Sequence, residues 1–202
     1  QKVTREAARA FEELGCTVEE VDVGWDFSVL DAQTTFQETL LAALAGDLYP
    51  RWKYEMDAMV RIGIERGMQL SAKRYYDINF VRGKMYETLG PILENYNVML
   101  CPTTALPGLP AVHDLLDTSL RINGKPLTYG NLPGDKWLQW QLSYPFNMIP
   151  ECPVAVVPSG FVEAGLPLGM QIVGQTYDDV SVLRAAADYE RIRPWRDNRP
   201  PI

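Results

Sequence analysis

The sequence predicts an α/β fold in which helices cover a sheet of buried strands. Two short runs, residues 154–157 and 168–173, are almost continuously apolar, a pattern typical of strands covered on both faces. Several longer segments repeat apolar residues every three or four positions, as amphipathic helices do. The chain has 202 residues, of which 47% are hydrophobic and 22% charged. This length and composition predict a single domain spanning residues 1–202.

The N-terminal residues predict a helix followed by a strand. Residues 3–14 place their apolar side chains on one helical face, and Gly15 follows as a helix-ending residue. Residues 16–23 alternate apolar and polar side chains, which is the pattern of a half-exposed strand. Because the chain begins with Gln1 rather than Met, we expect it to be part of a longer gene product.

Two helices are predicted before residue 95. The first lies within residues 26–48 and ends at Gly46 and Pro50. Its apolar stripe consists of Phe36, Leu40, Leu41 and Leu44. The second helix is the longest: Ser71 is its N-cap candidate, and Gly90-Pro91 is predicted to end or kink it.

A short buried strand at residues 98–101 leads into a loop of residues 102–107. Loops at the carboxyl ends of strands in α/β sheets are frequent ligand sites. Thr103 and Thr104 in this loop are therefore candidate substrate-binding residues. The alternative is that the two prolines of the loop only stiffen a connection.

The segment of residues 111–137 is the least regular part of the chain. Asn123-Gly124 predicts the turn of a small hairpin. His113 is the only histidine, and a solvated or capping role is predicted for it rather than a catalytic or metal-binding one. The spacing of Trp137, Trp140 and Tyr144 places them on one face of a predicted helix. Pro145 should end this helix.

The C-terminal part predicts two strands and a closing helix. The helix covers residues 178–190, with Asp178 and Asp179 placed at its start. Ser159 follows the first strand, and a turn role is predicted for it, because no nucleophile motif surrounds it. Residues 193–202 are rich in proline and arginine without periodicity, which predicts an extended tail.

Four motifs of this sequence resemble the amidase signature family. They are Cys101-Pro-Thr-Thr104, Tyr144-Pro-Phe-Asn147, Pro153-Val-Ala-Val-Val-Pro-Ser-Gly160 and Gly165-Leu-Pro-Leu-Gly-Met-Gln-Ile-Val-Gly174. The last three resemble the C-terminal end of the family. The resemblance covers the chain from about Ala72 onward. It implies carboxamide hydrolysis and a fold with a mixed sheet between helical layers. This chain would then supply a partial mixed β-sheet flanked by helices.

The resemblance also implies a substrate tunnel that this chain helps to wall. Trp140 and Tyr144 are the candidate pocket-lining residues from that comparison, beside Thr103 and Thr104. The alternative for the two aromatic residues is plain core packing. Pro150-Glu-Cys152 stands where the family often has glycine before the next proline, so the loop there is expected to differ.

The catalytic residues of the family find no counterpart in this sequence. Such enzymes use a nucleophilic serine, a second serine and a lysine, with the serines in a Gly/Ser-rich segment. The serines of this chain are scattered at Ser28, Ser71, Ser119, Ser143, Ser159 and Ser181. The chain is therefore predicted to be the C-terminal segment of an amidase, without catalytic residues and inactive alone. Two alternatives stay open: a non-catalytic binding or scaffold module of the same fold, or part of the A-type subunit of a tRNA-dependent amidotransferase.

Composition limits the classes of partner. The net charge of −7 argues against direct nucleic-acid binding. Three widely spaced cysteines predict neither disulfides nor a metal site, and no phosphate or dinucleotide motif indicates a cofactor. No signal peptide or membrane-spanning run is present in the sequence, so a cytoplasmic location is expected. The expected partner is a small amide substrate, and an exposed sheet edge predicts self-association.

Overall fold

The computed structural model describes residues 2–26, 28–108, 140–163 and 165–198, and the backbone of residues 121–122 and 125–126. The chain divides into two compact units. The first comprises residues 1–24, 88–109 and 141–202, and the second comprises residues 25–87 and 110–140. The prediction of a single domain stays a prediction.

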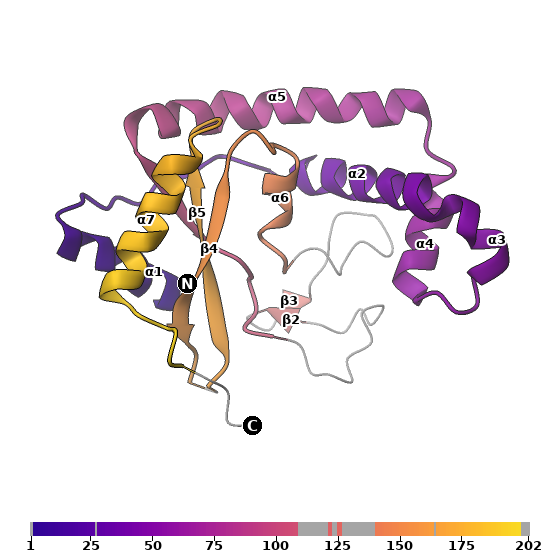
Figure 1. Ribbon diagram of the computed structural model, residues 1–202. Helices are drawn as coiled ribbons and strands as arrows, with labels where there is room; N and C mark the ends of the chain where they lie inside the picture. The colour runs from indigo at the N-terminus through magenta and orange to yellow at the C-terminus, as the bar shows by residue number, and fades with distance from the viewer. Residues whose placement is uncertain are drawn as a thin grey trace. The chain divides into compact units, whose positions relative to one another are not determined.

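The first unit contains a three-stranded sheet in the order β1-β5-β4 (Figure 1). Its strands are β1 (Val98–Pro102), β4 (Val154–Phe161) and β5 (Pro167–Gly174). Both pairings, β1 with β5 and β4 with β5, are antiparallel. The three strands predicted in this region are confirmed, and so is the α/β class with helices flanking a partial sheet. The described strands of this sheet pair only antiparallel, so the mixed sheet stays an expectation from the resemblance.

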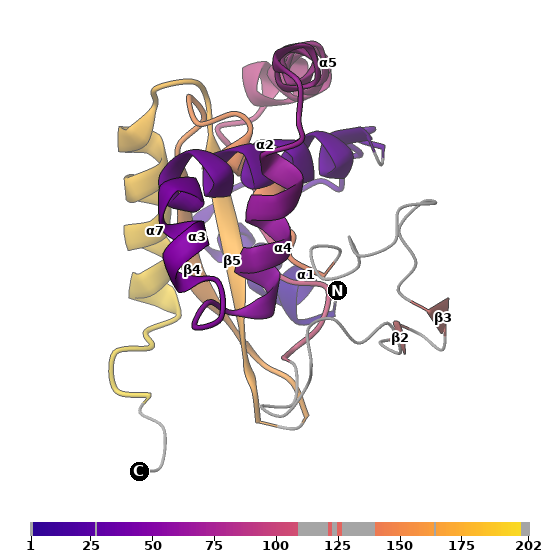
Figure 2. The same cartoon turned by 90° about the vertical axis from the view of Figure 1, so that its right-hand side faces the viewer.

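Two helices, α1 (Lys2–Arg9) and α7 (Asp179–Ile192), cover one face of this sheet (Figures 1 and 2). A 3₁₀ helix, η1 (Ala10–Leu14), continues α1. Since neighbouring residues of a strand point to opposite faces, Val157, Met170 and Ile172 contribute the sheet's side of this core. The buried core residues are Ala7, Ala10, Phe11, Val157, Met170, Ile172, Val182 and Tyr189.

Local signals in the sequence explain where these helices end and begin. Gly15 adopts a left-handed conformation with φ of 81° directly after η1, a conformation that glycine adopts at little cost. The side chain of Asp178 accepts a hydrogen bond from the backbone N–H of Ser181 at 3.1 Å. Asp178 is therefore the N-cap of α7, as predicted.

The strand predicted for residues 16–23 is wrong. These residues form no strand, and Val21 is exposed. Side chains hold the segment instead: Glu20 forms an ion pair with Arg5 at 2.7 Å, and Glu19 accepts a hydrogen bond from the hydroxyl of Tyr96. Alternation alone does not make a strand, because the backbone also needs a neighbouring strand to pair with.

The second unit contains four helical segments before α5. They are α2 (Ser28–Ala45), η2 (Gly46–Leu48), α3 (Tyr49–Trp52) and α4 (Ala58–Gly67). Helices α2 and α4 pack side by side. The Asp57 side chain accepts a hydrogen bond from the N–H of Met59 at 2.8 Å, which caps the start of α4.

Glycines set the close approach of α4 to α2. A Cβ atom at Gly67 would lie 2.0 Å from the carbonyl oxygen of Glu38, and one at Gly63 would lie 2.5 Å from Leu41 Cδ1. The stripe predicted for α2 is only partly correct, because Leu40 is 42% exposed and Leu44 is 74% exposed. The buried residues of α2 are Val29, Ala32, Gln33, Thr34 and Thr35. Small and polar side chains on this helix are buried in place of the larger leucines.

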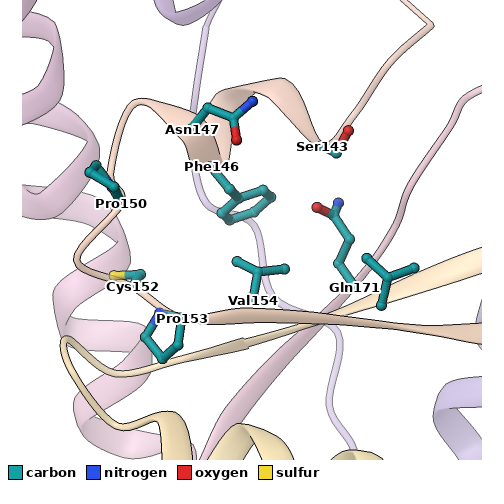
Figure 3. Close-up of a pocket in the computed structure, with 9 residues that line it drawn as sticks. Ser143, Phe146, Asn147, Pro150, Cys152, Pro153, Val154 and Gln171 are labelled. Carbon is teal, nitrogen blue, oxygen red and sulfur yellow. The ribbon is translucent and has the colours of Figure 1, made fainter.

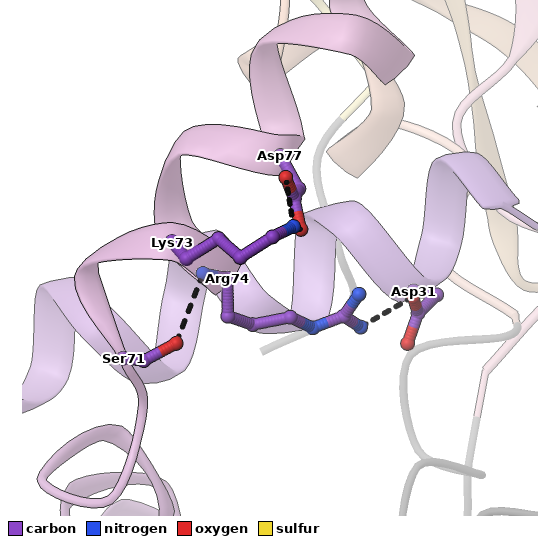
Figure 4. A network of polar contacts seen from close by, with 5 residues as sticks. All are labelled: Asp31, Ser71, Lys73, Arg74 and Asp77. Carbon is purple, nitrogen blue, oxygen red and sulfur yellow. Dashed lines mark hydrogen bonds and ion pairs between the residues drawn. The ribbon is translucent and has the colours of Figure 1, made fainter.

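The start of α5 (Ala72–Asn95) is fixed by polar contacts (Figure 4). The Ser71 hydroxyl accepts a hydrogen bond from the N–H of Arg74 at 3.1 Å, which confirms the predicted N-cap. Lys73 pairs with Asp77 at 2.8 Å along the helix, and Arg74 reaches Asp31 of α2 at 2.5 Å. These contacts join the first turn of α5 to α2.

Of the two outcomes predicted at Gly90-Pro91, an end of α5 is wrong, because the helix continues to Asn95, and a kink stays a prediction. Pro91 removes one backbone hydrogen bond from the helix. Burial of Leu89 and Leu93 on either side of the proline offsets that loss. The Asn95 side chain also donates a hydrogen bond to the carbonyl oxygen of Pro91 at 2.7 Å.

The predicted hairpin is present as two short strands, β2 (Arg121–Ile122) and β3 (Lys125–Pro126), which pair antiparallel. Its Asn-Gly turn lies outside the described residues, as do His113, Trp137 and residues 199–202 of the predicted tail.

Candidate functional site

A pocket of about 410 Å³ lies on the face of the sheet opposite α1 and α7 (Figure 3). The sheet contributes Val154, Val156 and Gln171 to its wall, and these alternate with the core residues of the other face. The segment before β4 contributes Ser143, Phe146 and Asn147. The pocket is thus a mainly apolar hollow with a few polar groups, as ligand pockets usually are.

The wall above the sheet is the short helix α6 (Tyr144–Asn147). The prediction of a helix that ends at Pro145 is wrong. Pro145 instead lies in the first turn of α6, and the described residues before α6 form turns and an isolated bridge. Proline is tolerated in a first turn, since the N–H that it lacks has no partner within the helix. Phe146 on this helix is buried and contributes to the pocket wall.

Gln171 is the most connected polar side chain of the pocket. It lies on the central strand β5, between Cys101 of β1 and Val156 of β4, and is 1% exposed. Its Nε2 lies 2.9 Å from the carbonyl oxygen of Pro102, 3.2 Å from that of Leu142 and 3.3 Å from Cys101 Sγ. One amide group therefore joins the sheet, the loop after β1 and the turn before α6.

Thr103 and Thr104, predicted as substrate contacts, lie in the loop that Gln171 holds. Both the N–H and the hydroxyl of Thr103 donate to the carbonyl oxygen of Gly169 at 3.1 Å. Thr104 forms a backbone bridge with Gln141, and the N–H of Leu142 donates to Thr103 O at 2.9 Å. The loop is therefore bound to β5 and to the turn before α6.

The two predicted aromatic residues fall in different units. Tyr144 lies in the first unit at the start of α6; burial raises the pKa of its hydroxyl, and a hydrogen bond with the Gln141 side chain lowers it in part. Trp140 is the last residue of the second unit, and its indole Nε1 is buried without a hydrogen-bond partner among the described residues. The substrate-binding role of all four predicted residues stays a prediction.

Sequence reasoning missed Gln171, although a signal was present. The strand reads Leu168-Gly-Met-Gln-Ile-Val173, and Gln171 is the one strongly polar side chain in that apolar run. A polar group in a buried strand needs hydrogen-bond partners. Its position therefore indicated a buried polar network at this point of the sheet.

Cys101 is half-buried, and its raised thiol pKa keeps it protonated at neutral pH. Burial raises the pKa of its thiol to about 12, although the hydrogen bond from Gln171 acts in the opposite direction. Cys152 is buried, whereas Cys16 is exposed.

We expect one fast-reacting thiol in the folded chain. At pH 8, about one Cys101 side chain in 10,000 is the reactive thiolate if its pKa is about 12. Labelling with a chromogenic disulfide reagent should modify Cys16 rapidly, and Cys101 and Cys152 at least about 100-fold more slowly. Peptide mapping identifies the labelled residue, and Cys16→Ser should abolish the fast phase. Fast labelling of Cys101 in the native chain would contradict its burial.

The turn role predicted for Ser159 is wrong. Ser159 lies within β4, where the register with β5 shifts between Pro158 and Gly160. It is the extra residue of a β-bulge. Its Oγ is buried without a partner among the described residues. It does not line the pocket described above.

The C-terminal arginines within the described residues pair with carboxylates. Arg191 lies 3.1 Å from Asp188, Arg196 lies 3.8 Å from Glu190, and Arg193 pairs with Glu13. Where side chains are described, no three histidine, cysteine or acidic residues gather to form a metal site. None of the described helices has the length and apolar character needed to cross a membrane.

Comparison with known proteins gives a consistent match. The family model described as Amidase matches residues 1–183. An acylamidase from Rhodococcus erythropolis is 27% identical over 202 residues, which cover 98% of this chain and 40% of the relative. The A-type subunit of a glutamyl-tRNA(Gln) amidotransferase from Geobacter sp. (strain M21) is 26% identical over 148 residues, covering 71% of this chain and 27% of that relative.

The structural match agrees with the sequence matches. The crystal structure of a bacterial aryl acylamidase of the amidase signature enzymes superimposes with a TM-score of 0.78 and 26% identity, over 96% of this chain and 40% of that protein. The chain thus spans about 40% of the length of the acylamidases it matches, and it corresponds to their C-terminal part.

Proposed function

This chain belongs to the amidase signature family, and we propose that it serves as the C-terminal segment of a hydrolase that cleaves carboxamide C–N bonds. The resemblance found in its motifs is confirmed. One observation carries the proposal: the family match runs through both units, yet the chain spans only 40% of the acylamidase. A match of this kind supports a structural and substrate-binding part of the whole enzyme.

The proposed role of the segment is to shape and orient the substrate, while the reacting groups lie elsewhere in the enzyme. Trp140, Tyr144, Thr103 and Thr104 are the proposed substrate-binding residues. Positioning of this kind lowers the barrier because a correctly held substrate needs less reorganisation to react. The expected substrate is a small carboxamide, in keeping with the acylamidase matches.

No catalytic role is proposed for the serines of this chain. Among the described residues, no serine side chain hydrogen-bonds to a lysine, which is the pairing that the family mechanism uses. Ser71 caps α5, and Ser28 and Ser181 hydrogen-bond to the aspartates at the starts of their helices. Ser143 lines the pocket, and its backbone carbonyl accepts a hydrogen bond from the N–H of Phe146.

Amide hydrolysis by the purified chain tests the proposal. Release of aniline from an anilide should stay at the uncatalysed rate with the chain alone. Co-expression with the part of the Rhodococcus acylamidase that this chain does not match should restore turnover if the two parts associate. Robust turnover by the chain alone would overturn the proposal.

The amidotransferase alternative fits less of the sequence. The amidotransferase relative matches 71% of the chain, whereas the acylamidase matches 98%. An independent binding or scaffold module would bind small amides but would not restore turnover with any complementary part. The co-expression assay therefore separates the module from the first proposal. We also propose a cytoplasmic location and no direct nucleic-acid contact, since the described cysteines form no disulfide and the described C-terminal arginines are paired.

We propose that the isolated chain self-associates through β4. Among the described strands, β4 pairs with β5 only, so its other edge offers unpaired backbone groups. Its sequence, Val154-Ala-Val-Val-Pro-Ser-Gly-Phe161, has no charged residue of the kind that prevents edge-to-edge pairing. Exposed Val156 and Phe161 add apolar surface.

Light scattering at increasing concentration checks this proposal. The average mass should rise with concentration, and Phe161→Lys should reduce the rise because it places a charge on the edge. Leu183→Lys, at an exposed position on α7, is the matched control and should leave the rise unchanged. A constant monomer mass for the unmodified chain excludes self-association through this edge.

A further inference from the structure

We propose that the outer face of α5 binds the same face of a second copy of this chain, with the two helices antiparallel (Figure 1). We call this face the α5 seam, and it consists of Lys73, Tyr76, Phe80, Gly83 and Glu87. All five residues belong to the second unit, and none is among the residues that line the pocket of Figure 3. The contact is separate from the strand-edge contact proposed for β4.

The α5 seam follows the spacing of a helix–helix contact. Its members are three, four, three and four residues apart, so they recur every 3.5 residues, which is the repeat that brings the side chains of two packed helices together. At 3.6 residues per turn, the seam lies on the side of the helix opposite Ile78 and Met85, which are 5% and 1% exposed. The chain itself therefore covers the other side of α5 and leaves the seam open.

Two aromatic side chains at the middle of the α5 seam are exposed to solvent. Phe80 is 75% exposed and Tyr76 is 67% exposed. The ring of Tyr76 meets that of Tyr75 edge to face, with 6.2 Å between the ring centroids, so a neighbouring side chain supports it before any partner binds. Exposed aromatic side chains with such support are typical anchors of protein interfaces. Their position on the helix therefore indicates a surface that another protein covers.

The placement of charge indicates that this partner is a second copy of the chain. Lys73 and Glu87 lie seven residues before and seven residues after Phe80. When two α5 helices pack antiparallel with the Phe80 rings at a two-fold axis, Lys73 of each copy lies opposite Glu87 of the other. A parallel pair would instead bring like charges together. Lys73 can leave its present pair with Asp77, because an exposed pair within a helix contributes little.

Gly83 provides room for the second aromatic ring in this arrangement. Tyr76 lies four residues before Phe80 and Gly83 lies three residues after it, so Tyr76 of one copy reaches the level of Gly83 of the other. A Cβ atom at Gly83 would have no atom within 4 Å, which leaves open surface beside the backbone. A large side chain opposite a glycine lets two helices approach closely.

Sedimentation equilibrium tests the α5 seam in the Phe161→Lys chain, in which a charge blocks the β4 edge. The mass should rise to twice that of the chain and no further, with a dissociation constant on the order of 100 µM for so short a contact. Phe80→Glu should weaken the dimer at least about 30-fold, because it places a charge where the two rings meet. A chain that stays a monomer at about 1 mM, as it would if another part of a longer enzyme covered the seam, would overturn the proposal.

Leu44→Glu is the matched control for Phe80→Glu. Leu44 is 74% exposed on α2, so the change adds the same charge at an equally exposed apolar position of the second unit. This variant should dimerise as the Phe161→Lys chain does, and circular dichroism should show that both glutamate variants keep their helices. An equal loss of the dimer in the two variants, or no loss in either, would contradict a contact through the α5 seam.

Reversal of the two charges tests the antiparallel register. Lys73→Glu and Glu87→Lys should each weaken the dimer about fivefold, since each change puts like charges at both ends of the contact. The chain that carries both changes should regain most of the original affinity, because opposite charges then face each other again. A double variant that dimerises no better than the single variants would show that Lys73 does not meet Glu87 of the second copy, and the proposed arrangement would be wrong.

Discussion

Gly67→Ala is expected to destabilise the second unit by at least about 3 kcal/mol, which is at the upper end of overpacking effects. The added Cβ atom would lie 2.0 Å from the carbonyl oxygen of Glu38, 2.6 Å from its carbonyl carbon and 2.8 Å from Ala42 Cβ. The nearest obstacle is backbone, so no side-chain rotation relieves the contact. The two helices must move apart, and the contacts that bury this face are weakened. Urea unfolding followed by circular dichroism measures the loss.

Gly83→Ala is the matched control for this change. Gly83 lies inside helix α5, and a Cβ atom there meets no atom within 4 Å. Alanine at this position should stabilise the chain by up to about 1 kcal/mol, because glycine is the poorer helix former. If alanine lowers the free energy of unfolding at Gly67 and raises it at Gly83, close packing rather than helix propensity requires glycine at position 67. A similar small gain at both positions would contradict the packing of α4 on α2.

The sequence predicts elements of this fold where a local rule decides the structure. Ser71 and Asp178 are N-caps because a side-chain oxygen meets the backbone N–H groups within three residues. The strand at residues 168–173 is likewise predictable, since its composition requires burial on both faces. These predictions need no knowledge of distant residues.

The predictions that are wrong depend on distant partners. Residues 16–23 alternate correctly but have no described strand beside them, and α5 continues through Pro91 because Leu89 and Leu93 are buried. Leu40 and Leu44 of α2 stay exposed because the glycines of α4 fix a different contact face. Tertiary packing decides each of these cases, and periodicity does not report it.

The candidate site was predictable only where local motifs define it. The motifs contain Thr104 and Tyr144, and Gln141 connects these two residues through a backbone bridge and a side-chain hydrogen bond. Thr103 is held beside them by the N–H of Leu142. The central group, Gln171, was visible only as a polar residue in an apolar run. Its orientation depends on carbonyl groups 29 and 69 residues away in the chain, which no local pattern reveals.

The second large effect is expected from Tyr189→Ala, which should destabilise the first unit by about 3–5 kcal/mol. Tyr189 is 2% exposed on α7, and its ring lies 5.5 Å from that of Phe11 and 6.2 Å from that of Trp195. Truncation leaves a cavity between α7, η1 and the sheet, because the neighbouring aromatic rings cannot fill the space. Thermal and urea unfolding measure the change.

A double-mutant cycle separates the ring contact from the loss of burial. Leu183→Ala, on the same helix but 65% exposed, is the control and should change stability by less than about 0.5 kcal/mol. Phe11→Ala combined with Tyr189→Ala should cost less than the sum of the single changes, with a coupling of about 0.5–1.5 kcal/mol from the stacked rings. Strict additivity would mean that the rings do not stack in solution. In that case α1 and η1 would not be anchored to α7 through this pair, and the covered face of the sheet would depend on the aliphatic residues alone.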